Sequence, residues 1–220
     1  MKTSTGRNIR RLLIIECDVE RLNKIDAALG VEISDLLETP RLASQITLIK
    51  VGKKADLQKR VIQLAEQGVV FENIWITAHS SETGLRLASD YWSSWTDLAR
   101  LLACFKPQAI LLAACKAGRC QPAEQLFGVI RSLKTLYGSP LLMTVSQMKI
   151  LRCVIAHLLL GINIRRESNL LLRIGAFIAT GGPLFRYIRS DFNKKTGKTR
   201  HDWNTIPDIL EILSRRRMPC

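Results

Sequence analysis

Two short segments carry side chains that could act together as a nucleophile and its partner. His79 follows the apolar run 73–78, and Cys115 follows the apolar run 109–114. A thiolate attacks carbonyl carbon readily, and a nearby imidazolium lowers the pKa of a thiol. The pair therefore predicts nucleophilic chemistry by Cys115, provided that the fold brings His79 beside it. The simpler interpretations are a core cysteine at a strand end and a loop histidine bonded to backbone.

The elements around these residues alternate between strands and helices up to residue 146. The strand cores are continuous apolar runs, which is typical of parallel strands buried on both faces and joined by crossover helices. In such an α/β sheet the functional residues lie at the carboxyl ends of the strands, and neighbouring strands are roughly 5 Å apart. We expect strands at 9–15, 46–51, 73–78, 107–114 and 141–146, and helices at 19–37, 54–67, 95–105 and 123–136.

These segments resemble the caspase-like cysteine peptidases, the superfamily that includes metacaspases, separase and the CHAT peptidases. Residues 115–118 (Cys-Lys-Ala-Gly) are similar to the Ala-Cys-x-x-Gly signature of that group, and His79 precedes Cys115 by 36 positions with one helix between them. Leu85 and Leu87 also resemble the CHAT pattern. The likeness covers roughly residues 9–150. It implies a caspase-like three-layer sandwich with a mainly parallel central sheet.

The resemblance also implies a mechanism. Cys115 attacks the scissile carbonyl, His79 protonates the leaving amine, and backbone N–H groups of Ser80 and Cys115 stabilise the oxyanion. The family places Gly directly after the histidine, whereas this chain has Ser80. A helix beginning after Gly118 is expected to bring its positive end close to the thiol.

The resemblance further places the substrate pocket at the ends of the first and fifth strands. Asp18 at that rim would suit a basic P1 residue, with Ser146 or Gln147 on the opposite wall. Asp18 is equally well interpreted as the N-cap of the following helix.

The positive charge is concentrated in the last third of the chain. The 220 residues carry a formal net charge of +14. Residues 151–220 hold 13 Lys and Arg against 5 Asp and Glu. We therefore predict an α/β core over 1–150 and a basic, mostly helical extension over 151–220 that packs on the core, with a hairpin at 186–201. The alternative function is an inactive α/β module that binds nucleic acid or an anionic protein through this extension. The candidate contacts are Lys194, Lys195, Lys198 and Arg200.

Further sequence features bear on the cellular compartment and on metal or membrane binding. No apolar run reaches the length of a signal-peptide core or a membrane span, and the six cysteines show no zinc-ribbon spacing. We expect a cytoplasmic protein with reduced thiols, without metal, cofactor or membrane contact. The resemblance implies a protein substrate, an activating protein partner, and a role in bacterial defence or regulated cell death.

Overall fold

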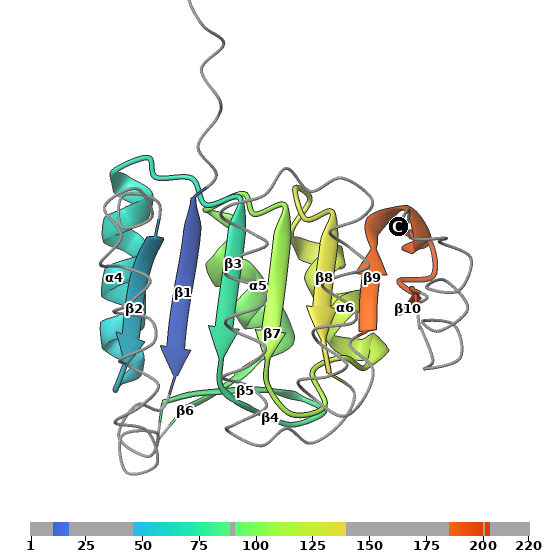
Figure 1. The fold of residues 1–220 in the computed structure, drawn as a ribbon, viewed down its shortest axis with the longest axis horizontal. Helices are drawn as coiled ribbons and strands as arrows, with labels where there is room; N and C mark the ends of the chain where they lie inside the picture. The colour runs from blue at the N-terminus through green and yellow to red at the C-terminus, as the bar shows by residue number, and fades with distance from the viewer. Residues whose placement is uncertain (1–10, 18–45, 89–90, 140–184, 200, 203–220) are drawn as a thin grey trace, which may run out of the picture.

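A computed structural model describes residues 11–17, 46–88, 91–139, 185–199 and 201–202. Its centre is a seven-stranded sheet with the order β10-β9-β8-β7-β3-β1-β2 (Figure 1). Five adjacent strands of this sheet are parallel, namely β2, β1, β3, β7 and β8. β9 runs antiparallel to β8, and β10 runs antiparallel to β9. The strands are β1 (Leu12–Cys17), β2 (Ile46–Val51), β3 (Asn73–Thr77), β7 (Ala109–Ala113), β8 (Thr135–Gly138), β9 (Phe185–Ile188) and β10 (His201–Asp202).

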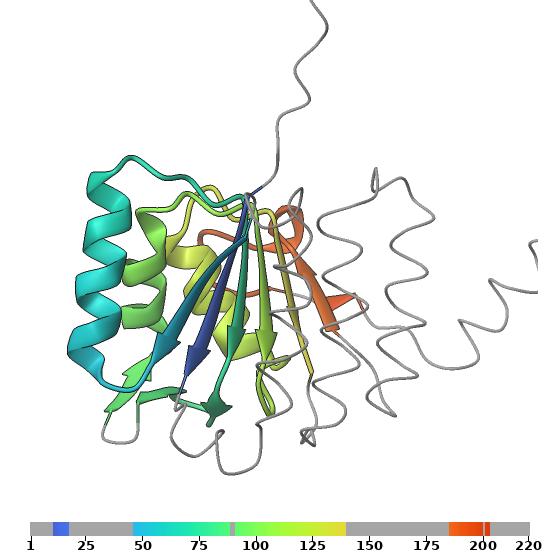
Figure 2. The same cartoon turned by 60° about the vertical axis from the view of Figure 1, so that its left-hand side comes forward.

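Three helices cover one face of this sheet (Figure 2). They are α4 (Lys54–Glu66), α5 (Trp95–Ala103) and α6 (Cys120–Val129). Their apolar faces pack on the sheet, and β1 and β3 are buried along their whole length. Burial of both faces explains why these strands read as continuous apolar runs. A short 3-10 helix, η1 (Arg189–Asp191), follows β9.

A second, three-stranded antiparallel sheet lies across the carboxyl ends of the parallel strands (Figure 1). It consists of β4 (His79–Ser80), β5 (Gly84–Ala88) and β6 (Tyr91–Ser94). Gly84 permits the close approach of β5 to β6, because a Cβ at this position would stand 2.0 Å from the carbonyl oxygen of Ser93. The sequence analysis did not predict this sheet.

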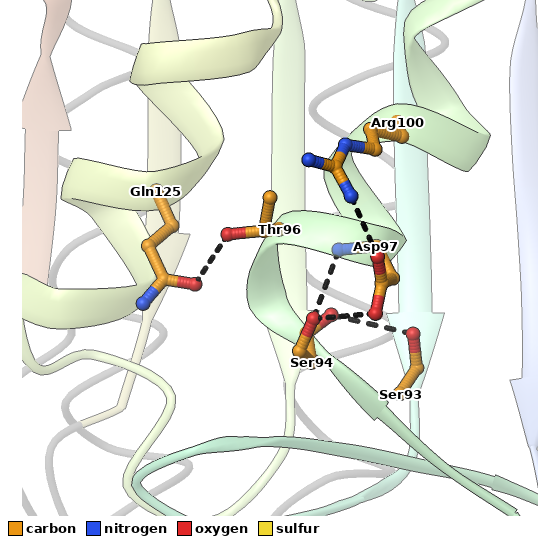
Figure 3. Close-up of polar contacts among 6 residues, drawn as sticks. All are labelled: Ser93, Ser94, Thr96, Asp97, Arg100 and Gln125. Carbon is orange, nitrogen blue, oxygen red and sulfur yellow. Dashed lines mark hydrogen bonds and ion pairs between the residues drawn. The ribbon is translucent and has the colours of Figure 1, made fainter.

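The end of β6 is fixed to the helical layer by the N-cap of α5 (Figure 3). The hydroxyl of Ser94 accepts a hydrogen bond from the backbone N–H of Asp97 at 3.1 Å, the usual contact of an N-cap serine. Arg100 pairs with the Asp97 carboxylate at 3.1 Å. Thr96 on α5 donates to the side chain of Gln125 on α6 at 2.9 Å, so the two helices are joined at the end nearest the small sheet.

The predicted strand at 46–51 has the observed bounds. The other predicted elements up to residue 114 that lie among the described residues differ from the observed ones by a few residues at their ends. The helix predicted over 123–136 is wrong in its second half: α6 ends at Val129, and β8 begins at Thr135. The hairpin predicted over 186–201 corresponds to the antiparallel pair β9 and β10. The expected helix at 19–37 and strand at 141–146 lie outside the described residues. The mixed α/β class with a mostly parallel sheet is confirmed.

Within the described part of the chain, none of the helices has the length and apolar character needed to cross a membrane.

Candidate active site

The central sheet brings the two predicted reactive residues to the same edge. β3 and β7 are neighbouring parallel strands, and their last registered pair is Thr77 with Ala113. His79 and Cys115 each follow two residues beyond that pair. Because neighbouring strands are separated by about 4.8 Å, the equal offset delivers both residues to adjacent positions at the carboxyl end of the sheet. The condition set by the sequence analysis, that the two strands be neighbours, is met.

The two residues differ in their access to solvent. His79 opens β4 and is exposed, while Cys115 stands in the turn after β7 and is partly buried. Cys115 is not part of a disulfide. His79 and Cys115 thus lie at the same edge of the sheet with different access to solvent.

Ser80 links the two strand ends. Its hydroxyl donates a hydrogen bond to the backbone carbonyl of Cys115. A glycine, the residue that the family places after its histidine, has no side chain to make this contact. This contact therefore connects the strand that carries His79 to the turn that carries Cys115.

The turn after Cys115 is held in a defined conformation. Lys116 has a φ of 57°, in the left-handed region that residues with a Cβ rarely adopt. The N–H of Ala117 donates to the carbonyl of Ala114 at 3.3 Å, and the N–H of Gly118 donates to the carbonyl of Ser139 at 2.8 Å. These bonds fix the turn against the end of β7 and against the residue that follows β8.

Two residues outside the motif support the same turn. The hydroxyl of Tyr187, on β9, donates to the carbonyl of Gly118. Burial raises the pKa of Tyr187 well above its usual range, so the phenol stays protonated and keeps donating. On β8, a Cβ at Gly138 would stand 2.7 Å from the carbonyl oxygen of Ala117, so only glycine allows the strand to lie so close.

An ion pair joins the loops that follow the two reactive residues. Arg119, four residues after Cys115, pairs with Glu82, three residues after His79. The indole N–H of Trp95 on α5 donates to the carbonyl of Glu82 at 3.0 Å. The two loops are thus connected to each other and to the helical layer. Sequence reasoning missed Glu82, Arg119, Gly138 and Tyr187, since their partners lie far away in the chain.

The helix after the turn begins after Gly118, as the sequence predicts. The first residue of α6 is Cys120, and Arg119 occupies the N-cap. The influence of a helix dipole falls off within about one turn of the helix end. Cys115 lies five residues before the helix starts, and the proximity of the helix end to its thiol stays a prediction.

The remaining predicted residues fall into two groups. Asp18, Ser146, Gln147 and Arg200 lie outside the described residues. Lys194, Lys195 and Lys198 are exposed in and beside the turn between η1 and β10, and Lys198 pairs with Glu124 on α6 at 3.4 Å. The extension predicted over 151–220 supplies β9 and β10 to the central sheet.

Comparison with known proteins identifies a solved structure with a similar fold. No protein-family model matches the chain, and no curated protein matches it. A solved structure does: a secreted C11 cysteine protease from Bacteroides thetaiotaomicron in complex with an irreversible peptide inhibitor. The two structures superpose with a TM-score of 0.57 at 12% sequence identity, over 84% of this chain and 67% of the protease. The chain has the caspase-like fold. At this identity the similarity concerns the fold, and the roles of individual residues rest on the geometry described above.

Proposed function

We propose that this protein is a caspase-like cysteine endopeptidase that hydrolyses peptide bonds through Cys115 and His79. The observation that carries the proposal is the equal offset of the two residues beyond the registered pair of β3 and β7. The left-handed conformation of Lys116, directly after Cys115, adds support, because backbone strain of this kind clusters at functional sites.

The proposed reaction has two steps. The Cys115 thiolate attacks the scissile carbonyl, and backbone N–H groups of Ser80 and Cys115 stabilise the oxyanion. The C–N bond breaks as the imidazolium of His79 gives its proton to the leaving amine. Water then adds to the thioester, His79 accepts a proton from it, and the carboxylic acid product leaves while the thiolate is restored.

Three finer parts of the proposal come from the sequence. An acidic Asp18 at the rim of the site would suit a P1 Arg or Lys, with Ser146 or Gln147 opposite. The four described cysteines are not part of disulfides, and we propose a cytoplasmic, reducing compartment. An activating protein partner and a role in defence follow from the family resemblance.

The direct test is covalent labelling of the full chain by a peptidyl-Arg probe with a thiol-reactive warhead, mapped by mass spectrometry. We expect labelling of Cys115 that is abolished in Cys115→Ala and reduced at least a hundredfold in His79→Ala, the usual range for a positioned acid–base group.

Cys104→Ser is the matched control. Cys104 is an exposed thiol whose pKa is raised by desolvation, so it should react slowly and its removal should leave the labelling of Cys115 unchanged. Absence of both labelling and cleavage in the folded wild-type protein would overturn the proposal. Equal labelling of wild type and His79→Ala would remove His79 from the mechanism.

A further inference from the structure

The hairpin formed by β4 and β5 fixes the direction in which the backbone of Ser80 points. The N–H of Ser81 donates to the carbonyl of Gly84 at 2.9 Å and closes the turn. The next pair along the hairpin is Ser80 with Leu85. In an antiparallel ladder, hydrogen-bonded and non-hydrogen-bonded pairs alternate. Because Ser81 is bonded to Gly84, Ser80 belongs to a non-hydrogen-bonded pair, and its N–H and C=O point away from β5.

These two backbone groups lie on the outer edge of the small sheet. Among the described residues the strand order of this sheet is β4-β5-β6, so β4 is an end strand. The side chain of Ser80 projects toward the core, in one row with Leu85 and Ser93, which are 0% and 3% exposed. An end strand that directs its N–H and C=O outward is a template for pairing with another extended chain.

The outer edge of β4 lies on the side of Cys115. β1 and β7 flank β3 on opposite sides. β5 contacts β1, so β5 lies on the β1 side of β4. The outer edge of β4 therefore faces the β7 side, where the Cys115 turn follows the strand. The hydrogen bond from the Ser80 hydroxyl to the carbonyl of Cys115 joins β4 to that turn.

We propose that the substrate lies along this edge as an added strand parallel to β4, and that the C=O of Ser80 accepts a hydrogen bond from the backbone N–H of P2′, the second residue after the scissile bond. This inference rests on the proposed function, in which the N–H of Ser80 donates to the carbonyl oxygen of P1. The N–H and C=O of Ser80 point to the same side of β4. An extended chain bound by the first group therefore also meets the second, which is the usual way in which a peptide adds to a sheet edge.

The place of the proposed P1 pocket sets the direction of the substrate strand. Glu16 on β1 is in register with Thr77 on β3. The next residues, Cys17 at the end of β1 and Ala78 before β4, therefore stand level with each other. A P1 side chain that enters the pocket proposed at the end of β1 lies near the start of β4. The residues after the scissile bond then run toward the tip of the hairpin.

A substrate strand with this direction meets both backbone groups of Ser80. In a parallel pair, a residue donates to the carbonyl before its neighbour and accepts from the N–H after it. Ser80 therefore stands level with P1′, donates to the carbonyl of P1 and accepts from the N–H of P2′. The N–H groups of P1′ and P3′ point away from β4, because successive backbone groups along a strand alternate in direction. Recognition at this edge thus depends on the main chain of the substrate.

The first test is cleavage of a fluorescence-quenched peptide with Arg at P1 and Ala at the other positions. In two analogues an ester oxygen replaces one backbone N–H, which removes the donor and leaves every side chain unchanged. We expect the ester at P2′ to lower kcat/KM about three- to tenfold, the usual contribution of one hydrogen bond. The ester at P3′ is the matched control and should be cleaved like the parent peptide. Equal kcat/KM for the two esters would overturn the inference while leaving the peptidase function intact.

Amide hydrogen exchange followed by NMR tests the edge itself, in Cys115→Ala, which cannot cleave the peptide. His79 pairs with Arg86, and the alternation of the ladder directs the N–H of His79 to the carbonyl of Arg86. In the free protein we therefore expect the N–H of Ser80 to exchange at least tenfold faster than that of His79. Saturating parent peptide should slow exchange at Ser80 at least tenfold and leave His79 unchanged. Equal exchange of the two amides in the free protein, or no change at Ser80 with peptide, would overturn the inference.

A binding measurement separates this inference from the peptidase function. Cys115→Ala is titrated with fluorescein-labelled forms of the parent peptide and the two esters, and binding is followed by fluorescence anisotropy. We expect the P2′ ester to bind about three- to tenfold more weakly than the P3′ ester, which should bind like the parent. Equal binding of the two esters would overturn the inference. Weaker binding of the P2′ ester, when the wild-type chain neither labels nor cleaves, would support peptide docking along β4 and reject the peptidase.

Discussion

The hydroxyl of Ser80 donates a hydrogen bond to the backbone carbonyl of Cys115. This contact joins the residue after the candidate catalytic histidine to the candidate nucleophile itself. The family resemblance leads one to expect glycine at position 80, where the backbone N–H contributes to the oxyanion hole. Ser80 keeps an N–H for that role and adds a side chain that connects the two strand ends.

Removal of the hydroxyl should therefore separate the side-chain role from the backbone role. We expect Ser80→Ala to lower the free energy of unfolding by about 1 kcal/mol, the usual contribution of one hydrogen bond. The rate at which a peptidyl probe labels Cys115 should fall about tenfold, because the turn that carries the thiol loses one of its supports. Ser80→Thr, which keeps the hydroxyl, is the control. Labelling of Ser80→Ala at the wild-type rate would show that the contact does not position Cys115.

Gly138 on β8 is expected to allow the close approach of this strand to the same turn. In Gly138→Ala the new Cβ would stand 2.7 Å from the carbonyl oxygen of Ala117 and 2.8 Å from the N atom of Gly118. Both are backbone atoms, so the turn itself has to move. We expect the free energy of unfolding to fall by about 1–3 kcal/mol, typical of overpacking. The rate at which the probe labels Cys115 should fall by a larger proportion.

Gly128→Ala is the matched control for this substitution. Gly128 lies in α6, and a Cβ there meets nothing within 4 Å. Because alanine favours the helix over glycine, this variant should be more stable by about 0.5–1 kcal/mol and should label normally. Urea unfolding and probe kinetics on both variants check the contrast. Equal behaviour of the two variants would contradict the close approach at Gly138.

The sequence predicted the strands beside the candidate site because their burial is nearly uniform. β1, β3 and β7 are buried along almost their whole length, and an apolar run of at least three residues marks each one. The structure of the segment after Phe127 was harder to predict, because its buried residues follow a helical spacing. These residues are Ile130, Leu133 and Leu136. The chain nevertheless leaves the helix at Ile130, whose φ of −87° and ψ of 96° are extended. Sheet pairing with β7, which apolar spacing does not encode, decides the outcome.

The small sheet escaped prediction for a related reason. β4 has two residues and β6 has four, too few to show an alternating pattern. Their pairing depends on the placement of His79 by the parallel sheet and on the N-cap of α5 after Ser94. The contacts that hold the Cys115 turn could not be predicted either, because they join residues far apart in the sequence. Tyr187, for example, bonds to Gly118 across 69 positions of the chain.

The ion pair between Glu82 and Arg119 should contribute little to stability. Its side chains are 62% and 44% exposed, so solvent screens the charges. In a double-mutant cycle with Glu82→Gln and Arg119→Gln, we expect a coupling free energy below about 1 kcal/mol that shrinks further in 1 M salt. The pair nevertheless joins the two loops, so each single variant should slow the labelling of Cys115 about two- to fivefold. A large, salt-independent coupling would show that the pair is shielded from solvent.

Tyr187 makes the stability of the protein depend on alkaline pH. Burial raises the pKa of its phenol above the value of about 10 expected in the unfolded chain. Below pH 10 the phenol is protonated in both states, and its contribution to stability is fully present. Above pH 10 the unfolded state releases this proton while the folded state keeps it. The free energy of unfolding should therefore fall with rising pH, by up to about 1.4 kcal/mol per pH unit from this group.

Tyr187→Phe isolates the effect. The variant leaves the carbonyl of Gly118 without the phenol as donor, so we expect it to be about 1 kcal/mol less stable than wild type at pH 8. Because it has no phenol to titrate, its stability should decline less steeply above pH 10, and the two stability curves should converge as pH rises. Urea unfolding from pH 8 to pH 11 measures both curves. Parallel curves over this range would show that the phenol titrates equally in the folded and unfolded states, and that its bond to Gly118 does not keep it protonated.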